Sequence, residues 1–324
     1  MPTGSGTTVR LVTTAILLSA APALAQVNLF SNAGQPDTVG LSTGPVTSSG
    51  VAAPSGSFWS ELQDDTVFSS NAVCGVGCHS LNDAGAYRLA EDFAVSGEFG
   101  WRVDYASFYV YQPGWSQSAA PFAGVNVRIW SGVPGEAGSQ IVWGDATTNR
   151  FVGAMATSYY RVFHTTMPPF PPVPNTSRRV WRVIADLGGV VLPPGEYWID
   201  WQITNVVGSG EALSPSLPFV GLRGRAGANS RQWRPSFGGE WHSVIDEGKP
   251  SPVEDVPQEF PFMLAGVGRS CSPDFDGDGF LSGADFDLFV EAFESGVLAA
   301  DFDSDGFITG ADFDAFVGAF ESGC

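Results

Sequence analysis

Hydrophobic and polar residues alternate along several segments in the middle of the chain. In FAGVNVRIW, Val125, Val127 and Ile129 fall on one side of an extended chain, and the residues between them fall on the other. EYWIDWQI, RVWRVIADL and WRVDYASFYVY have the same period of two residues. Segments rich in glycine and proline, such as SGVPGEAGS and LGGVVLPPGE, separate them. The pattern therefore predicts β-strands joined by turns.

We assign residues 26–268 to one all-β domain. Its alternating segments give about nine or ten short strands, and none of its segments has a convincing helical period. EFPFMLAG is the predicted last strand, and MPPFPPVPNTS is a predicted polyproline loop. The expected fold class is mainly β, in the form of an antiparallel, jelly-roll-like β-sandwich.

Two segments near the end of the sequence have a helical period instead. Their apolar residues recur at i, i+3, i+4 and i+7, which places them on one face of a helix. The two faces consist of Phe286, Phe289, Val290 and Phe293, and of Phe313, Phe316, Val317 and Phe320. Each predicted helix has about ten residues, and helices this short are marginal alone in water. We assign residues 269–324 to a small second domain whose helices need further support.

The first 25 residues have the composition of a cleaved export signal. Arg10 is their charged residue, an apolar run from Leu11 to Leu24 follows, and Ala23-Leu24-Ala25 is a small-x-small cleavage pattern. A membrane span needs about 20 apolar residues, and this run is shorter and contains threonine, serine and proline. We predict a signal peptide at 1–25, no membrane span after its cleavage, and a secreted or cell-surface location.

Negative charge concentrates in the small domain. Residues 271–324 contain ten Asp, three Glu and no Lys or Arg, a formal charge of −13. The whole chain carries −19, or −20 without Arg10 of the export signal, so residues 26–270 carry only −7. Such a tail repels nucleic acid and anionic membranes, which argues against both as partners, and it attracts cations.

The acidic tail contains one pattern twice, with an offset of 27 residues. Aspartate occupies positions 1, 3, 5 and 12 of each loop, glycine position 6 and a hydroxyl residue position 9. Calcium takes six to eight oxygen ligands, and a tight loop brings such side chains and the carbonyl of position 7 to one centre. The predicted ligands of two calcium ions are Asp274, Asp276, Asp278, Phe280, Ser282 and Asp285, and Asp301, Asp303, Asp305, Phe307, Thr309 and Asp312.

Two further expectations follow from the repeat. Position 8 is apolar in both loops, so a short β bridge between Leu281 and Ile308 is expected. The eight loop carboxylates repel one another without a cation, so the tail should be ordered with calcium and poorly folded without it.

Duplicated loop-then-helix units, with Asp at position 12 and an apolar position 8, resemble the dockerin family. An ordinary EF-hand has Glu at position 12 and a helix before each loop, whereas the residues CSP before Asp274 cannot form a helix. The resemblance covers 271–324, and the final ESGC resembles the GC-type dockerin tails of exported planctomycete proteins. It implies calcium binding and a cohesin-like or cell-surface anchoring partner. Positions 10 and 11, which help to set partner choice in that family, are Gly283, Ala284, Gly310 and Ala311.

The four cysteines suggest disulfides, because their number is even and the chain is predicted to be exported. The simplest pairing is local, Cys74 with Cys78 and Cys271 with Cys324. An alternative for the last pair is a terminal thiol attached to a surface component. CGVGCH has one more residue between its cysteines than a haem attachment motif, so a disulfide is the preferred interpretation of that segment.

Signals of catalysis are weak. The histidines His79, His164 and His242 lie far apart in sequence, which is unlike a zinc-ligand pattern. A glycosidase needs two carboxylates across a cleft, and the available ones stand in no recognisable motif. These carboxylates are Glu61, Asp200, Glu211, Glu240 and Asp246.

Tryptophan-rich segments favour a binding role. Sugars bind aromatic faces that are bordered by polar groups. The candidate ligand-binding residues are Trp198, Asp200 and Gln202 on one strand face, and Trp233 and Trp241 on either side of RPSFGGE. The alternative for each tryptophan is a place in the core. Four segments, LAEDFAV, GVNVRIWSGVPGEAGSQIVWGD, YYRVFHTT and LPPGEYWIDWQ, also resemble the non-catalytic β-sandwich domain of exported proteins with varied C-terminal anchors.

We therefore expect a secreted or cell-surface, non-catalytic binding or structural protein with a calcium-dependent tail and a polysaccharide as a possible ligand. The alternative is an extracellular polysaccharide hydrolase carried by the same tail. A third possibility is a purely structural coat protein.

Overall fold

The computed structural model describes most of the chain. The described residues are 27–33, 40–47, 50–62, 75–80, 87–97, 99–163, 176–206, 210–215, 217, 224–235, 238–248, 252, 254–269, 271–278 and 280–323. The predicted signal peptide and most of the predicted polyproline loop lie outside them. Among the described residues, no helix has both the length and the apolar character needed to cross a membrane.

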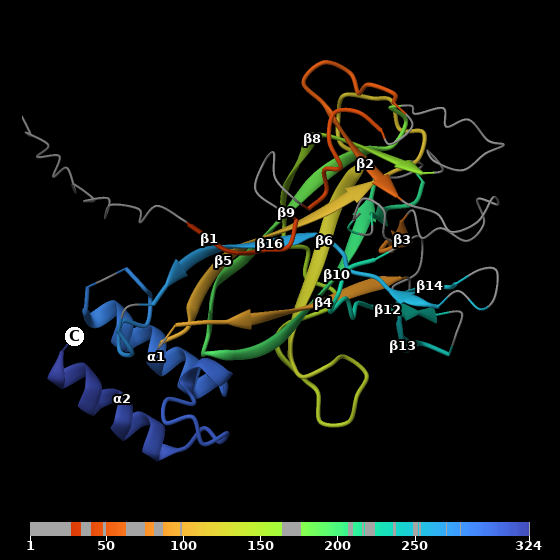
Figure 1. The fold of residues 1–324 in the computed structure, drawn as a ribbon. Helices are drawn as coiled ribbons and strands as arrows, with labels where there is room; N and C mark the ends of the chain where they lie inside the picture. The colour runs from red at the N-terminus through yellow and green to blue at the C-terminus, as the bar shows by residue number, and fades with distance from the viewer. Residues whose placement is uncertain are drawn as a thin grey trace, which may run out of the picture.

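The described part of the chain is mainly β and ends in two helices, as the two periodicities predicted (Figure 1). The strands are β1 (Val27–Ser31), β2 (Phe58–Leu62), β3 (Val76–Gly77), β4 (Arg88–Val95), β5 (Trp101–Tyr111), β6 (Phe122–Ser131), β7 (Gln140–Gly144), β8 (Phe151–Phe163), β9 (Arg179–Leu192), β10 (Gly195–Asn205), β11 (Leu213–Ser214), β12 (Arg231–Arg234), β13 (Glu240–Ser243), β14 (Ile245–Asp246), β15 (Val256–Pro257) and β16 (Phe262–Gly268). The helices are α1 (Gly283–Ser295), the short 3₁₀ helix η3 (Leu298–Ala300) and α2 (Gly310–Ser322).

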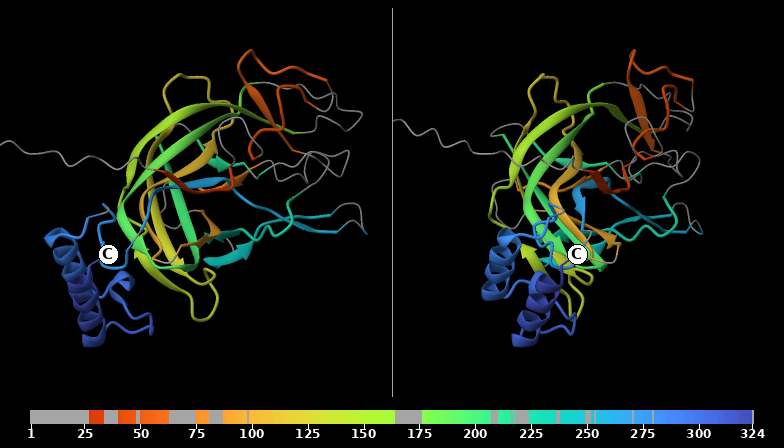
Figure 2. Two further views of the ribbon diagram at one scale, coloured as in Figure 1. Left: turned by 60° about the vertical axis from the view of Figure 1, so that its left-hand side comes forward. Right: turned by 90° about the vertical axis from the view of Figure 1, so that its left-hand side faces the viewer.

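Two sheets form the sandwich. One has the strand order β1-β16-β5-β9-β8-β2, with β11 paired to β5 and β3 paired to β11. The other has the order β13-β12-β4-β10-β6-β7. Their strand pairs are antiparallel except for β2 with β8, which is parallel. Figure 2 shows the strands curving around a common interior.

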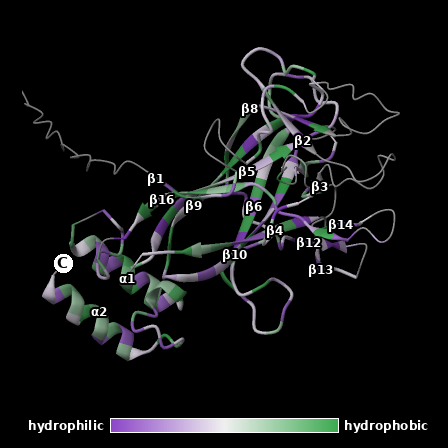
Figure 3. Cartoon of the chain, in the orientation of Figure 1, coloured by the Kyte–Doolittle hydropathy of each residue, from purple (hydrophilic) through white to green (hydrophobic). Residues whose placement is uncertain are grey.

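Alternation along β6 and β10 produces the two faces of the second sheet. The core-facing residues of these strands are Val125, Val127, Ile129, Tyr197, Ile199, Trp201 and Ile203. On the other face the register places Trp198 opposite Trp130 and Asp200 opposite Arg128. Green segments in Figure 3 mark hydrophobic residues along the strands and the two helices. The predicted strand faces are thus confirmed.

The two helices lie side by side at one end of the sandwich (Figures 1 and 2). Each has 13 residues, which is longer than the ten predicted. Ser282 and Thr309 are their N-caps, and each forms a capping box with the aspartate three residues later. α1 ends at Gly296, whose φ of 65° lies in the left-handed region that favours glycine. The helix boundaries therefore follow from local sequence chemistry.

Candidate metal centre and surrounding surfaces

Each acidic loop brings three carboxylates together. Ligand oxygens of Asp274, Asp276 and Asp278 lie within 4.8 Å of one another, and those of Asp301, Asp303 and Asp305 do the same. Among the described residues, these two groups are the clusters of three or more His, Cys, Asp or Glu that meet this limit. The spacing of two residues in sequence therefore produces two common centres.

The aspartate at position 12 closes each loop. Asp285 accepts hydrogen bonds from the backbone N–H groups of Asp276 at 3.0 Å and Ser282 at 2.7 Å. Asp312 accepts from the N–H groups at positions 2, 3 and 9 of its own loop, at 2.7, 3.2 and 2.7 Å. Both aspartates are fully buried. One side chain thus fixes the loop and caps the helix that follows.

The aspartates at positions 3 and 5 each use one oxygen on the backbone. Asp276 accepts the N–H of Asp278 at 2.9 Å, and Asp278 accepts that of Phe280 at 2.8 Å. Asp303 and Asp305 accept equivalent bonds at 3.1 and 2.8 Å. Within the described residues, the second oxygen of each of these four carboxylates makes no hydrogen bond. These oxygens could serve as ligands of a cation.

Desolvation, neighbouring charges and backbone N–H donors shift the pKa values of three loop aspartates. Desolvation raises the pKa of Asp276, and the charges of three other aspartates in its loop raise it further. Desolvation and its loop neighbours also raise the pKa of Asp303. Desolvation acts in the same sense on Asp312, but its backbone N–H donors outweigh it and lower the pKa of that residue. A bound cation would relieve the repulsion between the carboxylate at position 3 of each loop and its neighbouring carboxylates.

The donor atoms of both loops suit a hard divalent cation. Neither loop contains His or Cys, and oxygen-only ligand sets favour calcium, magnesium or manganese over softer metals. The hydroxyls of Ser282 and Thr309 accept the N–H groups of Ala284 at 3.1 Å and Ala311 at 3.2 Å, so they cap the helices. The predicted turn glycine Gly279 lies outside the described residues. The residues present fit calcium, whose sites tolerate this mixture of carboxylate, carbonyl and water oxygens.

The first loop packs on the sandwich. Arg102 of β5 donates a hydrogen bond to the carbonyl of Asp276. Arg269 donates to the carbonyl of Asp274 at 3.2 Å and to that of Phe99, before β5, at 3.1 Å. Asp274 is only 1% exposed. Arg102 of the sandwich and Arg269, which directly follows β16, thus hold the backbone of loop positions 3 and 1.

The second loop is exposed, and among the described residues its hydrogen bonds stay within the tail.

Position 4 differs between the loops. Gly277 has a φ of 69°, and a Cβ there would lie 3.2 Å from a methyl group of Val267. Ser304 has a φ of 62° and is, in the part of the chain described here, the non-glycine residue with positive φ. The same turn is therefore relaxed in one loop and strained in the other.

The apolar helix faces pack against each other. Phe289 and Phe316 stack with ring centroids 3.8 Å apart and planes 3° from parallel. Val191 of β9 joins this cluster from the sandwich. The apolar faces of the two helices thus pack against each other and against the sandwich. At the starts of the helices, four residues stay exposed: Gly283, Ala284, Gly310 and Ala311. The expected bridge between Leu281 and Ile308 is not among the β bridges of the described residues.

Three of the candidate sugar-binding residues are buried. Trp198 is 7% exposed, Asp200 0% and Gln202 2%. Asp200 pairs with Arg88 and with Nε of Arg128 at 2.8 Å. Burial lowers the pKa of the Arg88 guanidinium, and the charge of Asp200 opposes that shift. This strand face therefore contains a buried ion cluster, and its candidate ligand-binding residues Trp198, Asp200 and Gln202 do not form an exposed surface for a sugar.

Trp233 and Trp241 are half-buried and contact each other. Their ring centroids lie 6.0 Å apart at an interplanar angle of 66°. Trp241 also meets Trp130 edge-on at 6.3 Å. Arg128 lies 5.0 Å over the ring of Trp130. The tryptophans on this side mainly pack against one another.

The cysteines correct one predicted pairing. Cys78 is a free thiol in the core, and its Sγ lies 3.7 Å from the carbonyl oxygen of Ala212. The predicted Cys74–Cys78 disulfide is therefore wrong, because Cys78 is a free cysteine buried in the hydrophobic core. Desolvation raises the pKa of this buried thiol. Cys271 is disulfide-bonded. Since Cys74 and Cys324 lie outside the described residues, its pairing with Cys324 stays a prediction.

The histidines and remaining carboxylates are dispersed. His79 is buried, and its Nδ1 lies 3.2 Å from the Ala212 carbonyl oxygen. His242 lies on β13, and His164 is outside the described residues. Glu61 on β2 and Asp246 on β14 are buried, whereas Glu211 and Glu240 are exposed. No zinc-type group of three such ligands forms among the described residues.

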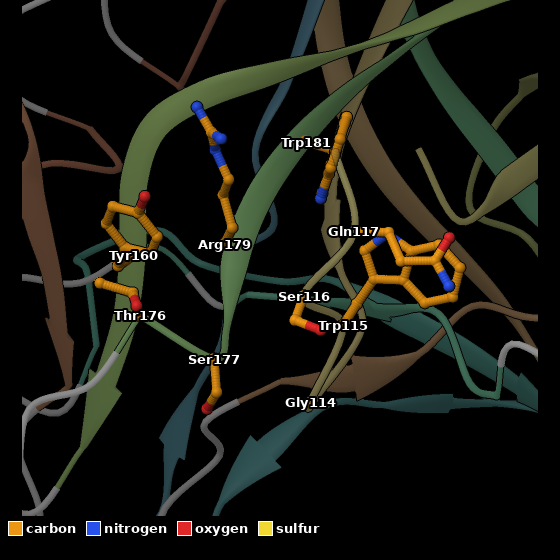
Figure 4. Close-up of a pocket in the computed structure, with 9 residues that line it drawn as sticks. All are labelled: Gly114, Trp115, Ser116, Gln117, Tyr160, Thr176, Ser177, Arg179 and Trp181. Carbon is orange, nitrogen blue, oxygen red and sulfur yellow. The ribbon is translucent and has the colours of Figure 1, made fainter. Parts of the chain in front are cut away.

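Sequence analysis missed two sets of residues. The arginines that hold the first loop stand in no motif, because their partners are backbone carbonyls distant in sequence. A pocket between the segment after β5, the end of β8 and the start of β9 was also missed (Figure 4). Trp181 lies in a segment with strand alternation, and only the fold brings Trp115 and Tyr160 to it.

Comparison with protein-family models, with curated proteins and with solved structures found no match to this chain.

Proposed function

We propose that the C-terminal domain is a dockerin-like module that binds two calcium ions and anchors the protein at a cell surface. The observation that carries the proposal is the pair of three-aspartate centres, each followed by a capped helix. Bound calcium supplies positive charge that the loops lack. The aspartates at positions 1, 3 and 5 offer oxygens, and Asp285 and Asp312 hold the loop backbones in register.

Each loop also orders a helix whose stability depends on its neighbour. The phenylalanine cluster forms only if both helices are in place, because each contributes rings to it. Charge repulsion within the loops opposes this arrangement, and calcium removes the opposition. Metal binding at two loops is thereby linked to formation of one small hydrophobic core.

Limited proteolysis of the full chain tests this proposal. With calcium, the segment after residue 270 should resist cleavage, and with a chelator it should be cut first. Magnesium at the same concentration is the matched control, since a smaller octahedral ion fits a carboxylate-rich loop less well. Equal cleavage rates in calcium and chelator would contradict a metal-organised tail.

The partner proposed for the tail is a cohesin-like or other surface-anchoring protein. The exposed starts of α1 and α2 lie beside Phe280 and Phe307, whose side chains are 69% and 72% exposed. These duplicated positions offer two related contact faces. Chelator should release the protein from intact cells into the medium, whereas a wash with salt alone should not.

For the sandwich we propose a non-catalytic binding role, with carbohydrate as the first ligand to test. An aromatic-lined pocket on it supports this role. A soluble-polysaccharide assay on the full chain separates the alternatives. Retained polysaccharide without new reducing ends supports binding, new reducing ends support a hydrolase, and neither result supports a structural coat protein.

A further inference from the structure

A pocket lies at the end of the sandwich that faces away from the tail. The N–H of Gly114 donates to the carbonyl of Ser177 at 2.9 Å, which closes the segment after β5 against the start of β9. Together with the end of β8 they enclose a cavity of about 390 Å³. Cavities of this size hold small ligands or one or two sugar residues.

Three aromatic rings line the cavity. Trp115 and Tyr160 are half-buried, and Trp181 is 3% exposed. The indole N–H of Trp115 donates to the carbonyl of Ala119 at 2.8 Å, which fixes the orientation of that ring. The indole N–H of Trp181 has no hydrogen-bond acceptor among the described residues, and Figure 4 shows its nitrogen pointing to the space between the lining side chains.

Arg179 supplies the charge of the pocket. Its Nε donates to the carbonyl of Thr157 at 3.0 Å, and its guanidinium carbon lies 5.9 Å from the ring centroids of both Tyr160 and Trp181. Arg179 makes no ion pair with any residue that the structure describes. The described lining residues include no Asp or Glu. The pocket therefore combines aromatic surface, an unpaired positive charge and a free N–H donor.

We propose that this pocket binds an acidic sugar residue of a polysaccharide. The faces of a sugar ring pack on aromatic side chains, and its hydroxyls take hydrogen bonds from groups such as the Trp181 indole N–H. A carboxylate or sulfate group on the sugar pairs with the guanidinium of Arg179, whose planar fork matches both anions. A neutral sugar would leave Arg179 unpaired beside the ligand. The proposal specifies the sugar class for the binding role proposed above and rests on that role, not on calcium binding.

The placement of the pocket suits an anchored protein. Arg179 begins β9, and Val191, near its end, joins the hydrophobic cluster of the tail. A strand rises about 3.3 Å per residue, so the pocket and the tail are about 40 Å apart along β9. A protein held by its tail would present this pocket outward. Sugar binding should consequently be insensitive to calcium.

Calorimetric titration of the full chain with trisaccharides tests the proposal. The probes are trigalacturonate, a sulfated galactose trisaccharide and neutral trigalactose, each titrated in calcium and in chelator. We expect one of the acidic probes to bind at least about tenfold more tightly than the neutral one, which is the effect of a charge-assisted hydrogen bond. Preference for trigalacturonate would identify the anion as a carboxylate, and preference for the sulfated probe as a sulfate. Chelator should leave either affinity unchanged.

Substitutions locate the site. Arg179→Gln should weaken the acidic probe about tenfold and leave the neutral probe unaffected. Arg182→Gln is the matched control, because Arg182 points to the other face of β9, where it meets Met155 at 3.7 Å. Trp115→Ala should weaken all probes. If Arg179→Gln does not fold, two other results decide the question: the preference of the unaltered chain for an acidic probe, and the weaker binding of every probe by Trp115→Ala.

Three results would overturn the proposal. These are equal affinity for acidic and neutral probes, full affinity in Arg179→Gln, and no binding of any trisaccharide by a folded chain. Tight binding of the neutral probe alone would leave the carbohydrate role of the sandwich in place and reject only the acidic specificity. Failure of all sugars with intact calcium binding would reject the sugar role and leave the tail proposal standing.

Discussion

The two acidic loops have almost the same sequence and different surroundings. The first is buried at Asp274 and receives hydrogen bonds from Arg102 of β5 and from Arg269, which directly follows β16. The second is exposed over most of its length and is held from within the tail. The two similar ligand sets are therefore held differently, the first by contacts with the sandwich and the second by contacts within the tail. We infer that the sandwich pre-organises the first site, whereas the second depends more on the cation itself.

Residue choice at position 4 follows this difference. Glycine is favoured in the first loop, because its φ is positive and a Cβ there would lie 3.2 Å from a methyl group of Val267. In the second loop Ser304 is exposed and has a similar positive φ. Serine there raises the energy of the folded loop by about 1 kcal/mol. The loop that lacks outside support also has the strained turn.

Among the predicted changes, removal of the position-12 aspartate should have the largest effect on calcium binding and stability of the two loops. Asp285→Ala and Asp312→Ala should each abolish one calcium site and lose an N-cap partner that contributes about 1 kcal/mol. Asp285→Ala should also loosen the tail from the sandwich, because Asp285 holds the N–H of Asp276 whose carbonyl Arg102 binds. Thermal unfolding of the two variants in excess calcium measures how much each substitution destabilises the protein. Equal destabilisation by the two variants would contradict the proposed difference between the loops.

Arg102→Met should affect one site only. The part-buried carbonyl of Asp276 would lose its donor, and a lost hydrogen bond of this kind costs about 1 kcal/mol. The tighter calcium site should become severalfold weaker and the weaker site should not change. Arg182→Met, on β9 and away from the tail, is the control. A loss of affinity at both sites would mean that the arginine supports the whole domain.

Exchange of the position-4 residues should have a smaller effect. Ser304→Gly should stabilise the calcium-loaded tail by about 1 kcal/mol, because glycine adopts positive φ without strain. Gly277→Ser should destabilise it by more, since its Cβ meets Val267 as well. Chemical denaturation of both variants in excess calcium checks the pair. A destabilising Ser304→Gly would show that the serine hydroxyl has a role in the loop.

The smallest predicted effect concerns pH. A raised pKa at Asp276 means that its contribution to metal-free stability is fully present below pH 3.8, the ordinary value for Asp, and is lost as pH rises through the folded pKa. Asp276→Asn should therefore stabilise the chelated protein at pH 7 and not at pH 3.5. With calcium present the same variant should be destabilising at pH 7, because a ligand is lost. Thermal melts at two pH values, with and without chelator, test this reversal of sign.

Much of this architecture could be predicted from local patterns. Alternation located the strands around Val127 and Ile199, and helical spacing located the phenylalanine faces, because burial on one side of an element leaves a period in the sequence. Asp, Ser and Thr at fixed positions marked the loops and the helix caps. These features depend on residues that are close together in the chain.

Features that depend on the third dimension could not be predicted. The alternation placed Trp198 and Asp200 on the strand face opposite Tyr197 and Ile199. It could not reveal that both are buried there and that Asp200 pairs with Arg88 and Arg128. Cys78 lies near Cys74 in sequence, and its burial in the core was not evident from spacing. The docking arginines and the pocket around Arg179 likewise combine residues from distant strands.

A calcium titration of the full chain by calorimetry tests the central claim most directly. The account predicts two sites of unequal affinity, both lost in chelator, with Asp285→Ala removing the tighter one and Asp312→Ala the weaker one. Circular dichroism in parallel should show helix gained as calcium is added. No binding, or binding without any gain of helix, would contradict the proposal that calcium organises this tail.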